Sequence, residues 1–162
     1  MNGQHVRALL ASSTIAVSVV ALSHATAHAD NSRLNNGVVA NVYTIQHQAG
    51  CTTTIKKDPA LTLAAQWHTN DVLHNRSLDG DTGSDGSTPQ SRAQAAGYRG
   101  AVAQTVAINP ALAINNVDIL NQWYYDPVAF QIMSDCAYTS IGVWSENSLD
   151  RSVVVAVYGK PA

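Results

Sequence analysis

Few side chains in this sequence have the chemistry of a catalytic or metal site, and His68, Asp71 and His74 are the most closely spaced of them. A helix over this stretch places Asp71 within one turn of each histidine, but it separates the two imidazoles by about 120° and about 9 Å of rise. They cannot therefore bind one metal ion as a His-x-x-x-His pair does. We expect His68 to be buried and hydrogen-bonded, or to border a cavity, and His74 to lie at the surface.

A second group of polar side chains, the carboxylates Asp79, Asp81 and Asp85, lies in a glycine-rich stretch over residues 79–87. Clustered carboxylates on a flexible loop suit a calcium ion. The spacing of an EF-hand is absent, however, because Gly83 occupies the third ligand position and Gln90 replaces the terminal glutamate. The sequence therefore favours a solvated acidic turn.

Nucleophilic catalysis has no local motif here. The chain contains no G-x-S-x-G sequence and no serine beside a histidine in a recognisable loop, so we predict no catalytic residues. The two cysteines, Cys51 and Cys136, also lack the surroundings of a nucleophile. In an oxidising compartment such a pair most simply forms one disulfide, which would stabilise the fold by about 4 kcal/mol.

The N-terminus has the pattern of a signal peptide. Residues 1–29 contain one basic residue, Arg7, then an apolar run from Ala8 to Leu22, and end on the A-x-A sequence at Ala27–Ala29. Because that run is shorter than the ~20 residues that span a bilayer, we expect cleavage after Ala29, export, and no membrane span afterwards. An uncleaved membrane anchor is the alternative.

Residues 30–162 then form a single domain of ordinary size. Loss of Arg7 changes the formal charge from −2 to −3, and no basic patch remains that would favour nucleic acid as a partner.

Helical and extended segments follow one another along this domain. Asp58 and Pro59 open a helix that should end near Arg76, and Thr88 with Pro89 caps another over 90–96. A further helix is expected over 35–48, an exposed loop or edge over 52–57 and a short extended segment over 101–108. Two strands, 139–146 and 151–158, flank a turn at 147–150, and the apolar centre of the second predicts burial on both faces.

The stretch 109–127 is predicted as the central helix. Asn109 would be its N-cap, Pro110 its first residue, and Pro127 its end, with a short helix over 128–133 to follow. Its expected apolar stripe consists of Ala113, Val117, Leu120 and Tyr124, flanked by Ile114 and Trp123. Helices followed by a hairpin indicate a layered α+β domain.

Several motifs, in order, resemble the CAP superfamily of cysteine-rich secretory, antigen 5 and pathogenesis-related 1 proteins, in its compact bacterial form. The matching segments are Asn41–Tyr43, Asp58–Leu61, Ala64–Asp71, Asp81–Gly86 with Arg92 and Ala96–Tyr98, Gln104–Ala107, Trp123 with Asp126–Pro127, and Ile141–Val143. The resemblance covers nearly all of residues 30–162. It implies a three-layer αβα sandwich with a central cavity and a C-terminal antiparallel hairpin.

The same resemblance implies four candidate cavity residues, to which His68 is added from its place on the helix. Many members line this cavity with two histidines and two acids that can hold a divalent metal. Here the matching positions carry Asp81, Gln104 and Ala129, while Asp126 falls where some members have the second acid, and His68 is expected to border the cavity. Because an amide and a methyl group cannot replace a carboxylate and an imidazole, we predict that the metal site is lost and expect no cofactor.

These observations favour a secreted, non-enzymatic binding protein. The family resemblance suggests a lipid or another hydrophobic small molecule as its partner, and an envelope component or a protein is equally compatible with the cavity. The alternative is a protease-like hydrolase using Asp126, Asp81 and His68, which requires titratable groups within hydrogen-bond reach. A surface protein of purely structural role is a third possibility.

Overall fold

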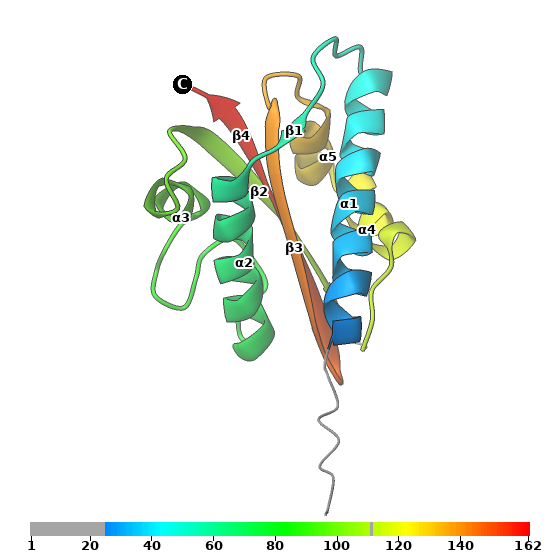
Figure 1. The fold of residues 1–162 in the computed structure, drawn as a ribbon, viewed down its shortest axis with the longest axis vertical. Coiled ribbons are helices and arrows are strands. Elements are labelled where there is room, and N and C mark those ends of the chain that lie inside the picture. The colour runs from blue at the N-terminus through cyan, green and yellow to red at the C-terminus, as the bar shows by residue number, and fades with distance from the viewer. Residues whose placement is uncertain (1–24, 111) are drawn as a thin grey trace, which may run out of the picture.

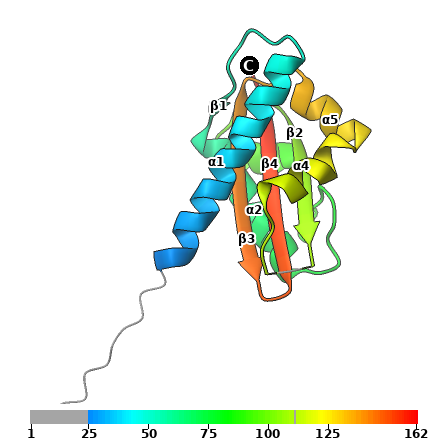
Figure 2. The same cartoon turned by 90° about the vertical axis from the view of Figure 1, so that its right-hand side faces the viewer.

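The computed structural model describes residues 25–110 and 112–162, and in it two layers of helices enclose a four-stranded sheet (Figure 1). Helices α2 (Pro59–His74) and α3 (Pro89–Ala95) cover one face. Helices α1 (Ala25–Gln48), α4 (Asn116–Tyr124) and α5 (Pro127–Ser134) cover the other (Figure 2). The predicted three-layer αβα fold is thereby confirmed. The predicted leader, residues 1–29, falls almost wholly outside the described residues and stays a prediction.

The sheet has the strand order β1-β3-β4-β2. Strands β3 (Ser140–Ser148) and β4 (Arg151–Pro161) form the predicted C-terminal antiparallel hairpin, and β2 (Gly100–Asn109) runs antiparallel to β4. Strand β1 (Lys56–Lys57) pairs in parallel with the start of β3. The two edges of the sheet therefore differ, since one strand has two residues and the other has ten.

Hydrophobic packing on both faces of β4 holds the layers together. Every residue from Arg151 to Gly159 is buried, as the apolar centre of this strand predicts. Val154, Ala156 and Tyr158 join the core beneath α1, α4 and α5, whereas their neighbours Val153, Val155 and Val157 join the core beneath α2 and α3. The sheet thus separates two apolar cores, each closed by its own helices.

Local capping explains where α2 begins. Asp58 Oδ1 accepts hydrogen bonds from the backbone N–H groups of Ala60 at 2.8 Å and Leu61 at 3.0 Å, and Pro59 occupies the first helical position. Helix α2 then lies so close to β3 that a Cβ on Gly142 would come within 2.1 Å of the backbone of Leu61. Only glycine permits this contact between the helix and the sheet.

The prediction for residues 109–127 is wrong in its N-terminal half. Asn109 is the last residue of β2, where it pairs with Ser152, and it caps no helix. The true cap is Asn115, whose side chain accepts from the N–H groups of Val117 and Asp118. Strand pairing across the sheet overrides the local Asn-Pro signal, because ten consecutive residues of β2 pair with β4.

The predicted apolar stripe of this helix is also wrong. Val117 is 65% exposed and Tyr124 is 44% exposed, whereas Ile119 and Trp123 are the buried residues of α4. The helix that starts at Asn116 contacts α1 and β2 through Trp123, a residue expected to flank the stripe, and through Ile119, a residue outside the predicted stripe.

The predicted disulfide between Cys51 and Cys136 is present, with the two Cα atoms 5.2 Å apart. It joins the connector after α1 to the connector after α5, next to the short strand β1. No helix in the described part of the chain is both long enough and apolar enough to cross a membrane.

Candidate functional site

A hollow of about 500 Å³ lies at the outer edge of β2, between the loop that follows α2 and the corner where α4 meets α5. Asp81, Gln104, Asp126 and Ala129, four of the five predicted cavity residues, line it. The remaining lining residues are Asp79, Gly80, Thr105, Val106, Gln122, Trp123, Val128 and Ile132. The fold therefore brings these four residues together from three separate stretches of the chain.

A hydrogen-bonded network occupies the polar side of the hollow. The guanidinium Nη2 of Arg92 donates to Gln104 Oε1 at 3.1 Å and to the backbone oxygen of Asp81 at 2.7 Å. Gln104 Nε2 in turn donates to Asp81 Oδ1 at 3.0 Å. Arg92 is only 5% exposed, and this burial lowers the pKa of its guanidinium. Because Arg92 of α3 and Asp81 of the loop bond the two ends of the Gln104 amide, this side chain is held in one position between α3 and the loop.

The fifth predicted residue, His68, lies behind this loop and does not line the hollow. Its side chain is 1% exposed, and Nε2 is 2.8 Å from the carbonyl oxygen of Gly80. Since a carbonyl oxygen only accepts, Nε2 carries the proton, and the buried Nδ1 has no hydrogen-bond partner. Burial lowers the pKa of His68, which favours the neutral ring. His68 thus holds Gly80 in place from the core.

Asp126 and Ala129 belong to the opposite wall. Asp126 Oδ1 accepts from the N–H groups of Val128 at 2.8 Å and Ala129 at 2.9 Å, so this carboxylate caps α5. The capping bonds hold Asp126 against the helix N-terminus and leave its charge at the mouth of the hollow. Ala129 contributes only a methyl group.

The residues present do not fit the divalent metal that the fold family implies. Within residues 25–110 and 112–162, no three His, Cys, Asp or Glu side chains come close enough together to hold a metal ion. Gln104 already uses both ends of its amide in bonds to the protein, His68 is buried with Nε2 bonded to the Gly80 carbonyl, and the cationic Arg92 contacts Gln104. We derive no chemistry through a metal at this site.

Two glutamines outside the predicted site residues bind the free edge of β2. Gln122, from α4, accepts from the Ile108 N–H and donates to the Ile108 carbonyl, both at 3.2 Å. Gln90, from α3, accepts from the Val102 N–H at 3.1 Å and donates to the Gly100 carbonyl at 2.9 Å. No local pattern reveals these contacts, because each glutamine meets the strand only after the layers have packed.

Apolar side chains on the α4–α5 wall form a group that we call the aromatic rim: the exposed Tyr124, Tyr125 and Val128, and the partly buried Phe130. Tyr125 is 78% exposed and Val128 is 68% exposed. The ring of Tyr124 makes edge contacts with Tyr125 at 5.5 Å and Phe130 at 5.1 Å. Of these four side chains only Val128 lines the hollow, so the aromatic rim extends outward from the α5 side of a hollow that carries three aspartates.

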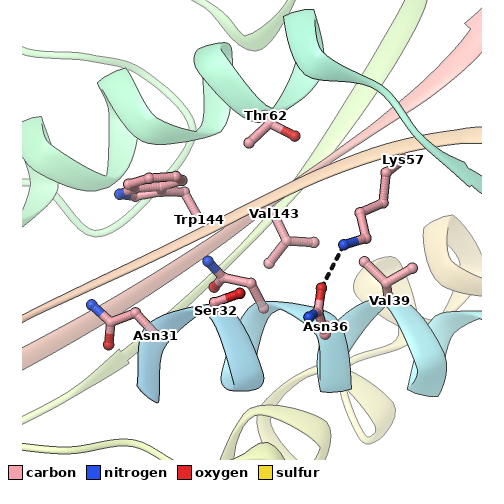
Figure 3. A pocket seen from close by; sticks show the side chains of 9 residues that line it. Asn31, Ser32, Asn36, Val39, Lys57, Thr62, Val143 and Trp144 are labelled. Carbon is pink, nitrogen blue, oxygen red and sulfur yellow. Dashed lines mark hydrogen bonds between the residues drawn. The ribbon is translucent and has the colours of Figure 1, made fainter. Parts of the chain in front are cut away.

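A smaller hollow of about 170 Å³ lies between α1 and α2 above β3 (Figure 3). Lys57 crosses it to donate a hydrogen bond to Asn36, and Val143 and Trp144 of β3 form its floor. It contains none of the predicted site residues, so the larger hollow is the candidate site.

Comparison with known proteins places this fold. The family model "CAP: Cysteine-rich secretory protein family" matches residues 41–158. Among solved structures, an outer surface protein of Borrelia burgdorferi is similar with a TM-score of 0.68 and 15% identity, covering 82% of this chain and 94% of that one. An extracellular protein of Bacillus anthracis with an SCP domain gives a TM-score of 0.71 and 12% identity over 88% of this chain and 45% of that one.

A cysteine-rich secretory protein of Staphylococcus aureus is a third, more distant structural match, with a TM-score of 0.55 and 11% identity over 80% of this chain and 39% of that one. No curated protein matches the sequence. Identities this low establish the fold alone, whereas the family model spans well over half of the chain. Together with the αβα layers and the motifs that run through them, this match shows that the chain belongs to the CAP family of cysteine-rich secretory proteins.

Proposed function

We propose that this chain is an exported, non-enzymatic binding module whose partner occupies the hollow at the edge of β2. The observation that carries the proposal is the Arg92–Gln104–Asp81 network, which uses the inward-facing polar groups for structure. What remains open to a partner is the acidic mouth and the aromatic rim. Such a surface suits recognition and offers no poised nucleophile or base.

The hydrolase alternative lacks the geometry that it needs. A general base must reach the proton that it removes, directly or through one water. His68 is buried and donates to the Gly80 carbonyl, and among the described residues it forms no ion pair with Asp81 or Asp126. The two acids are fixed by Gln104 and by the N-terminus of α5.

A hydrophobic ligand would have to bind at the surface. Between α1 and α4 the apolar interior leaves a space of only about 10 Å³, which is about what a single water molecule needs, roughly 10–15 Å³. A lipid chain therefore has no room inside this core. The exposed rings of Tyr124 and Tyr125 offer the accessible apolar contact beside the hollow.

Export is part of the same proposal. It is supported by the leader pattern of residues 1–29, by the Cys51–Cys136 disulfide, which suits an oxidising compartment, and by the extracellular or outer-surface descriptions of the structural relatives.

Site-specific photocrosslinking in the producing cells tests this proposal. A photoreactive amino acid replaces Val128 at the hollow, and the matched control carries it at Leu149, which is 87% exposed on the β3–β4 turn. We expect one dominant, chemically unaltered adduct, lipid or protein, at Val128 and none at Leu149. Tyr125→Ser should reduce its yield. Equal labelling at both positions, or a cleaved product, would contradict the proposal.

A further inference from the structure

The edge of β2 is only partly closed. In an antiparallel strand the N–H and C=O of successive residues point to opposite edges. The side-chain bonds to the N–H groups of Val102 and Ile108 show that even-numbered residues of β2 point away from β4, which is the one strand paired with β2. The outward backbone groups of this strand must therefore find partners elsewhere.

Both ends of the strand have such partners. Gln90 bonds the Gly100 carbonyl and the Val102 N–H at one end, and Gln122 bonds the N–H and the carbonyl of Ile108 at the other. The indole Nε1 of Trp123 donates to the carbonyl of Val106 at 3.0 Å. These side chains occupy the positions that hydrogen bonds from a neighbouring strand would take.

The middle of the strand has none. The outward groups that remain are the Val102 carbonyl, the Gln104 N–H and carbonyl, and the Val106 N–H, and no hydrogen bond joins any of them to another described residue. Gln104, which is only 4% exposed, and the partly buried Val106 line the hollow, so a partner must enter the hollow to reach these groups. Unpaired donors and acceptors in register along an edge form a template for an added strand.

The length and charge of this opening define its partner. Four residue steps from Val102 to Val106 span about 13 Å, which accommodates about four residues of an extended chain. Asp79, Asp81 and Asp126 line the hollow, whereas no Lys or Arg does. Arg92, which donates to the Asp81 backbone oxygen and to Gln104, is itself buried. The mouth is therefore negatively charged and complements a positively charged ligand.

We propose that the hollow binds an extended peptide segment carrying lysine or arginine, added as a strand to the free middle of β2. This inference rests on the proposed function, because it names the partner of the same hollow. The peptide residue opposite Gln104 exchanges two backbone hydrogen bonds with it. The basic side chains of the peptide meet Asp79, Asp81 and Asp126, and its apolar side chains meet the aromatic rim.

The test uses a capped pentapeptide of alternating valine and lysine, titrated into the protein expressed from its full sequence and followed by calorimetry and NMR. We expect saturable binding and downfield shifts of the Gln104 and Val106 amide protons. Two control peptides should each bind at least about tenfold more weakly. One is N-methylated at its central residue and loses one backbone hydrogen bond. The other carries glutamate in place of lysine and loses the charge attraction.

A protein variant probes the other side of the contact. Val106→Pro removes an outward N–H without removing a bond to β4, and Val106→Thr keeps that N–H and the branched shape. We expect the proline variant to lose about tenfold or more in affinity and the threonine variant to retain it. If the proline variant does not fold, the N-methylated peptide decides on the unmodified protein.

Two results would overturn this inference. One is equal binding of the N-methylated and unmethylated peptides, and the other is the absence of peptide binding. A lipid adduct at Val128 without peptide binding would refute the added strand and leave the hollow as a binding site. No adduct and no peptide binding would refute both proposals.

Discussion

Both edges of the sheet carry backbone groups that could pair with another chain, and the two edges differ in how far these groups are protected. Strand β1 presents two exposed lysines over two residues, and short, charged edges resist pairing with other chains. Strand β2 presents ten residues, and Gln90, Gln122 and Trp123 cover its ends but not its centre. A protected edge and a partly open edge in one sheet indicate that the opening at Gln104 has a role beyond packing.

The largest expected effect is a loss of stability at the protected edge, because β1 comes shortly after the disulfide-bonded Cys51 in the sequence. Replacing both Cys51 and Cys136 with alanine should lower the free energy of unfolding by about 4 kcal/mol, because the bridge closes a long loop of the unfolded chain. Urea unfolding measures the loss, and reduction of the unmodified protein should reproduce it. A loss below about 1 kcal/mol would show that packing alone holds this side.

The next effect concerns the support of the open edge. Arg92→Met should lower the free energy of unfolding by about 3 kcal/mol, because it leaves the buried Gln104 Oε1 and the part-buried backbone oxygens of Ser87 and Asp81 without their charged donor. Arg99→Met, at an exposed position, should change it by no more than about 0.5 kcal/mol. Equal losses in the two variants would show that the Arg92–Gln104–Asp81 network does not stabilise this edge.

A smaller effect is expected where Gln122 closes the end of β2. Gln122→Ala should cost about 1 kcal/mol of unfolding free energy and accelerate hydrogen exchange at the Ile108 amide, which loses its acceptor. Asn121→Ala, next to it on α4 and exposed, is the matched control. Unchanged exchange at Ile108 would show that this glutamine does not close the edge.

The smallest effect is a pH dependence from His68. Burial, the largest cause, lowers its pKa in the folded protein below the ordinary value of 6.5. As pH falls through 6.5 the unfolded chain gains a proton first, so the unfolding free energy declines until the folded pKa is reached.

His68→Gln should flatten this decline, while His74→Gln, at an exposed position, should keep it. Urea titrations at a series of pH values between 7.5 and 4.5 measure both slopes. A slope that survives His68→Gln would assign the dependence to another group.

Local chemistry explains which parts of the fold the sequence predicts. The Asp58–Pro59 start of α2, the Thr88 cap of α3 and the C-terminal hairpin all depend on neighbouring residues, and each lies where expected. The Asn109–Pro110 signal misleads because β4 captures Asn109 through pairing with Ser152. Strand β1 has no propensity of its own and exists through its pairing with Ser140 and Ile141.

The candidate site was likewise predictable in part, where local motifs exist, and unpredictable where contacts depend on packing. Family motifs place Asp81, Gln104, Asp126 and Ala129 around one hollow, yet they give no hint that Gln104 would be locked between Arg92 and Asp81. The position of His68 behind the loop and the two glutamines on β2 depend on tertiary packing. No local sequence pattern encodes such contacts.

Amide hydrogen exchange along β2 in the free protein tests the central claim most directly. If the middle of β2 is unpaired, we expect rapid exchange at Gln104 and Val106, whose N–H groups point away from β4. We expect slow exchange at Thr105 and Ala107, which point toward β4, and intermediate rates at Val102 and Ile108, which the two glutamines hold. Equal protection of Gln104 and Thr105 would mean that this edge is closed, and would contradict the account.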